Sequence, residues 1–113
     1  MEKIVKVTLS EPLQTLAGEK IQELTLDFGK IKARDMASIN RIESRLKGAS
    51  DTLSVANMSK ASSTEWRIAF SWVAACRGTK GICYDDIDAL TIADVLEMGN
   101  VCIPFVVATS SLS

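Results

Sequence analysis

Residues 62–77, SSTEWRIAFSWVAACR, decide the fold, because this stretch carries a wide apolar surface at helical spacing. Ser62 and Glu65 have the spacing of a capping box, and Gly78 follows, so we expect a helix that ends at Arg77. At about 100° per residue, its apolar side chains cover an arc of about 220°. Such a helix is either central to the fold or shared with a partner.

Two tryptophans mark this helix. Trp66 and Trp72 are six residues apart, so they point about 120° away from each other. We expect one of them to face the core and the other to face a partner or a neighbouring layer. The alternative is that both lie in the core, since other elements can wrap a helix on two sides.

Upstream of this helix, two segments alternate with the period of a half-buried strand, residues 3–9 and residues 20–28. Between them, Pro12 removes a ladder donor and Gly18 permits a positive φ, so both favour a turn or a bulged loop. We predict a β-hairpin over residues 3–28. A hairpin alone is marginal in water, so helices or another chain must cover its apolar face. The residues predicted on that face are Val5, Val7, Leu9, Leu24, Leu26 and Phe28.

Residues 35–48 predict an amphipathic helix. Asp35 can serve as its N-cap, and Gly48 lies where a left-handed C-terminal residue is common. The next stretch, residues 49–63, is rich in Ser, Ala and Thr, and we interpret it as a loop with at most a short helix. The apolar positions of the amphipathic helix are Met36, Ile39, Ile42 and Leu46.

After residue 77, the sequence predicts a turn, a short acidic helix and a final amphipathic helix. Residues 78–81 form the glycine-containing turn, and residues 85–90 open the acidic helix. Thr91 caps the final helix, Pro104 ends it, and residues 105–113 are expected to fray. The final helix is predicted to have one apolar face, made by Ile92, Val95, Leu96, Cys102 and Ile103.

These patterns predict one α+β domain over residues 1–113, in which the N-terminal hairpin packs on a small bundle of three to four helices within residues 35–104. A chain of 113 residues with 47% hydrophobic residues is long enough to bury a core of its own. We find neither 18 consecutive apolar residues nor an N-terminal signal peptide. The sequence therefore predicts a cytosolic protein.

The composition excludes several classes of function. The chain has no histidine, which removes Ser–His and Cys–His nucleophile pairs, an imidazole base and His-containing zinc sites. Its net charge is −1 without a basic run, so nucleic acid is not an expected partner. No two of the three cysteines, Cys76, Cys83 and Cys102, have the C-x-x-C spacing. We predict that they are small buried side chains.

An acidic group near the C-terminal end is the nearest approach to a chemical site. Its members are Asp85, Asp86, Asp88, Asp94 and Glu97. Carboxylates are the ligands that Mg²⁺ and Ca²⁺ prefer, but the spacing does not match a calcium loop, and capping explains acidic residues in a first helical turn. We predict no catalytic residue, no metal ligand and no cofactor. A metal-dependent enzyme built on these carboxylates stays open as an alternative.

Short motifs lie near both ends of the chain: residues 5–12 (VKVTLSEP) and 21–26 (IQELTL), then residues 84–94 (YDDIDALTIAD) and 103–105 (IPF). Together they bracket residues 3–107. In this order they resemble the tail assembly chaperones of long-tailed bacteriophages. The resemblance implies a non-enzymatic protein that acts in the host cytoplasm and is absent from the mature virion.

Members of this family bind the tape measure protein and keep it soluble until tail tube subunits assemble around it. We therefore expect the tape measure protein as a partner, and the tail tube protein as a second one. Self-association through the hairpin edge or Trp72 is a further hypothesis, and no membrane partner is expected. A small structural tail or baseplate component that stays in the virion is the alternative. The predicted partner-binding residues are Trp66, Phe70, Trp72, Leu96, Ile103 and Phe105.

Overall fold

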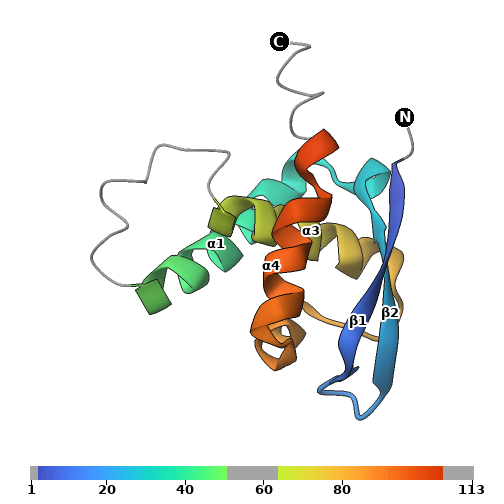
Figure 1. Ribbon diagram of the computed structural model, residues 1–113. Coiled ribbons are helices and arrows are strands. Elements are labelled where there is room, and N and C mark those ends of the chain that lie inside the picture. Colours follow the sequence, from blue (N-terminus) through green and yellow to red (C-terminus); the bar gives the residue numbers. More distant parts are fainter. Residues whose placement is uncertain (1–2, 51–63, 106–113) are drawn as a thin grey trace.

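The computed structural model describes residues 3–50 and 64–105, which form a hairpin with helices packed against one face (Figure 1). The main elements are β1 (Ile4–Gln14), β2 (Lys20–Asp27), α1 (Met36–Ser50), α3 (Thr64–Gly78) and α4 (Ile92–Val101). Three short 3₁₀ helices join them, η1 (Phe28–Lys30), η2 (Ala33–Asp35) and η4 (Tyr84–Ala89). The predicted α+β class, with an N-terminal hairpin on a helical bundle, is confirmed.

β1 and β2 form one antiparallel sheet, as the alternation predicts. The register pairs Val5 with Leu26 and Val7 with Leu24, so the apolar side chains of both strands share a face. Leu24 and Leu26 are fully buried, and Val7 is nearly so. Burial of this face against the helices stabilises a hairpin that would be marginal alone.

β1 is longer than predicted, because it continues beyond residue 9 to Gln14. The register shifts between Thr8 and Leu13, and Pro12 lies inside this irregular stretch. Proline has no N–H to donate, so a strand tolerates it where the ladder is interrupted. The turn that follows has Gly18 at a φ of 93°, a conformation that glycine adopts without steric cost.

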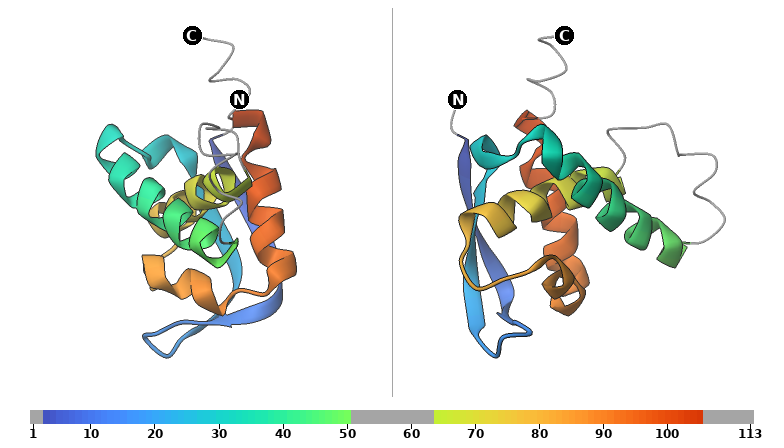
Figure 2. Two further views of the ribbon diagram at one scale, coloured as in Figure 1. Left: turned by 90° about the vertical axis from the view of Figure 1, so that its left-hand side faces the viewer. Right: turned by 180° about the vertical axis from the view of Figure 1, so that it is seen from behind.

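α3 lies in the middle of the molecule, where it packs against β2, α1 and α4 (Figure 2). Trp72, Val73 and Ala74 are completely buried. The indole Nε1 of Trp72 donates a hydrogen bond to the backbone oxygen of Tyr84 at 2.9 Å, so its polar atom is satisfied in the interior. Of the two alternatives for this helix, the structure shows the central position.

The start and end of α1 differ from the prediction. α1 continues to Ser50, past Gly48, because a glycine inside a helix costs only about 1 kcal/mol. Asp35 belongs to η2 instead of capping α1, and its carboxylate accepts the backbone N–H of Lys32 at 2.8 Å. The carboxylate is held there by a second partner, Arg77.

The end of α4 also differs, whereas its start is confirmed. Thr91 caps the helix through its Oγ1, which accepts the backbone N–H of Asp94 at 3.2 Å. α4 ends at Val101, three residues before Pro104. Proline cannot donate to the carbonyl four residues back and crowds the residue before it, so the helical ladder stops early.

One core joins the elements: buried apolar side chains from the hairpin, α1, α3 and α4 pack into a single cluster. β1 begins and α4 ends at the same end of the molecule (Figures 1 and 2). None of the helices in residues 3–50 and 64–105 has the length and apolarity that a membrane crossing requires. The predictions for residues 51–63, including the capping box of Ser62, and for residues 106–113 lie outside the described residues.

Candidate functional site

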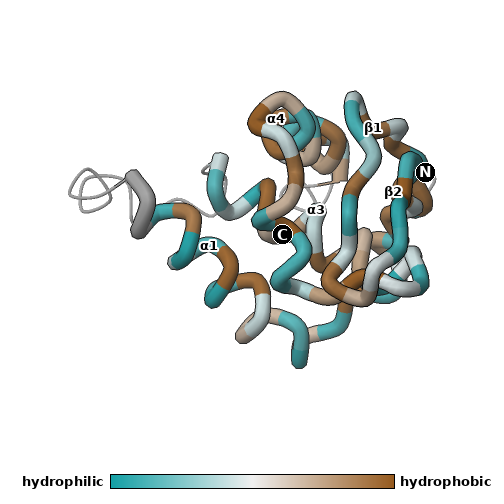
Figure 3. Tube along the Cα trace, turned by 90° about the horizontal axis from the view of Figure 1, so that it is seen from below, coloured by the Kyte–Doolittle hydropathy of each residue, from teal (hydrophilic) through white to brown (hydrophobic). Residues whose placement is uncertain are grey.

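α4 and the turn after it expose a stripe of large apolar side chains. Among the described residues, Ile92 is 74% exposed, Leu96 51% and Ile103 40%. Their spacing of four and seven residues places them on one side of the helix. We call this set the α4 stripe. Figure 3 shows how apolar segments recur along α4.

The other residues of the predicted apolar face, together with Met98, face the core, so that face is divided in two. Met98 and Cys102 are fully buried, and Val95 is partly buried against the core. α3 packs closely against α4 at Gly99: a Cβ on this glycine would lie only 3.1 Å from Cγ1 of Ile68. α3 therefore covers one side of α4 and leaves the α4 stripe in solvent.

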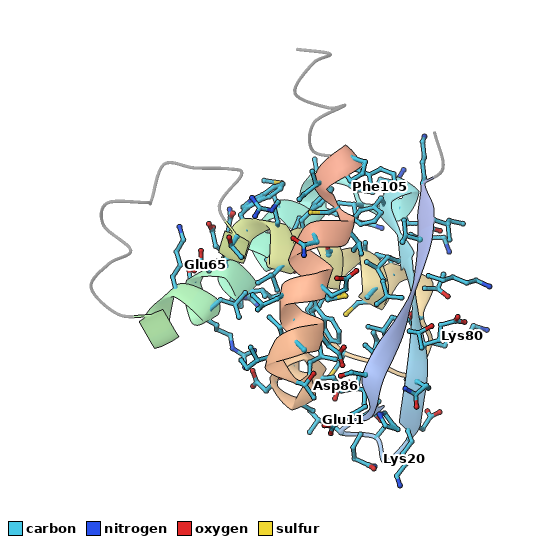
Figure 4. All side chains as sticks on the ribbon, in the orientation of Figure 1. Glu11, Lys20, Glu65, Lys80, Asp86 and Phe105 are labelled. Atoms are coloured by element: carbon cyan, nitrogen blue, oxygen red, sulfur yellow. The ribbon has the colours of Figure 1, made fainter. Side chains whose placement is uncertain are left out.

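Four aromatic rings form a row near the end of α4. Trp66 stacks on Phe70 with ring centroids 5.0 Å apart, Phe70 lies 5.3 Å from Phe28, and Phe28 stacks on Phe105 at 4.3 Å. We call these residues the aromatic row. It joins α3, η1 and the turn after α4, and Figure 4 labels Phe105 at its outer end. Offset aromatic pairs of this kind contribute about 0.5–1.5 kcal/mol each beyond their burial.

Five of the six predicted partner-binding residues fall into two groups, Leu96 and Ile103 in the α4 stripe and Trp66, Phe70 and Phe105 in the aromatic row. The three aromatic residues are half-buried. Trp72 is the exception: its exposure is 0%, so it offers no surface to a partner. The expectation that Trp72 binds a partner or a second copy is therefore corrected.

Two members of these groups were missing from the predicted set. Ile92 is the most exposed residue of the α4 stripe, and its position four residues before Leu96 was a usable signal. Phe28 was assigned only to the apolar face of the second strand. Its role in the aromatic row depends on contacts with residues 42 and 77 positions away, which a local pattern does not contain.

The acidic group does not converge on one point. Asp94 accepts the backbone N–H of Ser10 at 3.0 and 3.1 Å and the hydroxyl of the same residue at 3.0 Å. Asp86 accepts the backbone N–H of Leu16 and of Cys83, both at 2.8 Å. These two carboxylates fasten α4 and η4 to the first strand and the turn after it, and Figure 4 labels Asp86 below α4.

The outer carboxylates bind a cation of the chain itself. Asp85 accepts from Nη1 of Arg45 at 2.8 Å, and Asp88 accepts from Nη2 of the same guanidinium. Within residues 3–50 and 64–105, no three Asp, Glu or Cys side chains are grouped so that they could hold a metal ion. The acidic residues of this region act as caps and ion pairs between elements.

Hydrogen bonds shift the pKa of Asp94. Burial by itself would raise the pKa of this carboxyl, but the donors of Ser10 and Thr91 outweigh burial and hold the pKa below its usual value. Asp35 behaves similarly: its hydrogen bond with Arg77 lowers the pKa of the carboxyl and raises the pKa of the guanidinium. Both carboxylates are therefore charged at neutral pH and stabilise the folded chain there.

The three cysteines differ in their surroundings. Cys102 is buried and Cys76 is half-buried, whereas Cys83 is exposed, so the prediction of three buried thiols is wrong for Cys83. Burial raises the pKa of the Cys76 thiol to about 12 and raises that of Cys102 as well. Neither of these two thiols is activated as a nucleophile.

The end of α3 lies directly against β2. A Cβ on Gly78 would lie 2.3 Å from the backbone oxygen of Thr25, so only glycine fits this approach. The next residue, Thr79, accepts the backbone N–H of Thr25 at 2.9 Å and donates to its oxygen at 3.0 Å. One threonine side chain thus occupies the place of a neighbouring strand.

Comparison with known proteins adds no relative: no family model, no curated protein and no solved structure matches the chain.

Proposed function

We propose that this chain is a non-enzymatic tail assembly chaperone of a long-tailed bacteriophage, which binds the tape measure protein in the host cytoplasm and is left out of the virion. The α4 stripe carries the proposal, because it offers an apolar surface to a helix of another protein. The motifs at residues 5–12, 21–26 and 84–94 support the family. The tail tube protein is the second partner under this proposal.

The α4 stripe suits a helical client. Ile92, Leu96 and Ile103 repeat at spacings of four and seven residues, which matches the seam along which two helices pack. Transfer of such side chains from water to an interface contributes about 1.5–3 kcal/mol for each fully buried residue. The half-buried members of the aromatic row, Trp66, Phe70 and Phe105, add aromatic surface of the kind enriched in interfaces.

Co-expression with the tape measure protein tests this function. We expect the chain to raise the soluble fraction of the tape measure protein and to co-purify with it. Leu96→Asp places a charge in the middle of the α4 stripe and abolishes co-purification. Ala93→Asp is the matched control, because it adds the same charge to α4 at an exposed position outside the stripe, and it leaves the complex intact.

Two outcomes count against the proposal. If the wild-type chain neither solubilises the tape measure protein nor co-purifies with it, the chaperone function is wrong. If folded Leu96→Asp still co-purifies fully, the client binds elsewhere. Mass spectrometry of purified particles separates the alternative, because a structural tail or baseplate component would be found in the virion and a chaperone would not.

A further inference from the structure

The edges of the hairpin are covered unequally. Thr79 covers β2 at Thr25, and Asp94 covers β1 at Ser10. Each cover satisfies backbone groups that a sheet edge would otherwise leave open to another chain. Within residues 3–50 and 64–105, no side chain covers the first half of β1 in this way.

The pairing pattern shows which backbone groups are open. Phe28 donates to the backbone oxygen of Lys3 at 2.7 Å, and antiparallel strands alternate, so the odd-numbered residues at the start of β1 bond to β2. The N–H and C=O groups of Ile4, Lys6 and Thr8 therefore point away from the sheet. Among the described residues, no hydrogen bond reaches the outward side of these three.

Lysines lie near this open stretch. A wide, shallow depression of about 1040 Å³ is lined by residues 3–6 at the start of β1 and by Asp27, Gly29 and Lys30, where β2 ends and η1 follows. The charged residues in its lining are Lys3, Lys6, Lys30 and Asp27. Asp27 lies 3.9 Å from Nζ of Lys30, which leaves the depression with an excess of positive charge, although the whole chain has a net charge of −1.

We propose that residues 4–8 of β1 bind an extended, acidic segment of a protein partner, which adds to the hairpin as a third strand. The outward N–H and C=O groups supply main-chain hydrogen bonds, and Lys6 in this stretch, with Lys3 and Lys30 nearby, attracts carboxylates of the incoming strand. This surface is separate from the α4 stripe. The proposal therefore does not depend on the tape measure protein.

Charge decides against a second copy as the occupant. Symmetric antiparallel pairing of this edge would bring the Lys6 side chains of two copies into opposite or neighbouring pairs, with the other lysines close by. Like charges at such positions destabilise a sheet. Edge lysines repel neutral or basic strands as well, which is a common protection against uncontrolled pairing, and an acidic strand is the one that they attract.

A synthetic peptide tests the proposal on the full chain. The probe is a ten-residue peptide with blocked ends in which Glu alternates with Thr and Val. We expect saturable binding by isothermal titration calorimetry, weakened by salt, and slower amide hydrogen exchange at Ile4, Lys6 and Thr8 on addition of the peptide. A peptide with Lys in place of Glu, and one with N-methyl groups on alternate amides along its bonding edge, should not bind.

Two protein variants with the same charge change sharpen the test. Lys6→Glu should weaken binding about tenfold, since an attraction becomes a repulsion. Lys20→Glu is the control, because this exposed lysine lies at the other end of the hairpin (Figure 4), and it should change binding less than about twofold. Circular dichroism confirms that both variants fold.

Three results would overturn the proposal. The first is no binding of the Glu peptide at millimolar concentration. The second is equal binding of the Glu and Lys peptides, or binding that N-methylation does not reduce, since neither agrees with strand addition guided by lysines. The third is a dimer in sedimentation that protects the amides of Ile4, Lys6 and Thr8 without peptide, which would make a second copy the occupant.

Discussion

α3 and α4 are both rich in apolar residues, yet the fold covers them differently. α3 packs against β2, α1 and α4 and buries seven of its 15 residues. α4 packs against α3 and β1 only on one side and leaves Ile92 and Leu96 in solvent. Apolar content therefore does not tell which helix leaves an apolar surface exposed to solvent. The number of sides that the rest of the chain covers does.

The strongest test of this comparison is Trp72→Ala in α3. It removes a fully buried side chain and leaves a cavity, so we expect the free energy of unfolding to fall by about 3–5 kcal/mol. Urea denaturation followed by circular dichroism measures the change. A loss below about 1 kcal/mol would mean that α3 is not the centre of the core.

The glycines of the two helices give a matched pair of tests. Gly78→Ala in α3 pushes a Cβ against the backbone oxygen of Thr25, and we expect a loss of about 1–3 kcal/mol. In Gly99→Ala in α4, the one close contact of the new Cβ is with a side-chain atom of Ile68, at 3.1 Å, and the gain in helix propensity of about 1 kcal/mol offsets this contact. Thermal unfolding of both variants should separate them; equal melting temperatures would contradict the packing of Gly78.

Asp94 tests how α4 is held on β1. Asp94→Asn removes the charge that Ser10 and Thr91 stabilise, and we expect a loss of about 1–2 kcal/mol at pH 7. Because the pKa of Asp94 is lowered in the folded chain, its contribution is fully present above pH about 4 and is lost as the pH falls further. The stability difference between wild type and variant should therefore shrink between pH 5 and pH 2 in urea titrations. If the difference in unfolding free energy stays constant over this pH range, the charge of Asp94 does not contribute to stability.

The smallest effect on stability is expected in the α4 stripe. Leu96→Ser changes a side chain that is 51% exposed, so the free energy of unfolding should change by no more than about 0.5 kcal/mol. The same variant should weaken the complex with the tape measure protein. A stability loss comparable to that of Trp72→Ala would show that the stripe belongs to the core, and the contrast between α3 and α4 would fail.

Local periodicity was sufficient to predict the hairpin, α3 and the cap of α4. α3 and the cap depend on residues within one or two helical turns of each other, as the hydrogen bond from the backbone N–H of Asp94 to the Thr91 hydroxyl illustrates. The strands of the hairpin depend on the alternation of apolar and polar residues within each strand. The extension of β1 through Pro12 was not predictable in the same way, because a proline signals a break unless the bulge around it is known.

The division of α4 into a covered and an exposed side depends on long-range packing. A hydrophobic pattern locates the apolar residues of a helix, but α3 decides which of them it covers, through the close approach at Gly99. The same reasoning applies to Asp86 and Asp94, since their partners Leu16 and Ser10 are 70 and 84 residues away. The sequence suggested that these carboxylates cap their own helices. It could not indicate that they also bind backbone N–H groups of Ser10 and Leu16.

The distance in sequence between Ser10 and Asp94, 84 residues, has a consequence for the order of synthesis. The hairpin leaves the ribosome before the helices, whereas the carboxylates that bind the backbone N–H groups of Ser10 and Leu16 are made 84 and 70 residues later. At about 5–20 residues per second, the newly made hairpin spends several seconds with the backbone N–H groups of Ser10 and Leu16 unpaired. The outward backbone groups of residues 4–8 are open during the same time. A nascent chain is thus more prone to aggregate before α4 emerges, and a premature stop before residue 86 makes that exposure permanent.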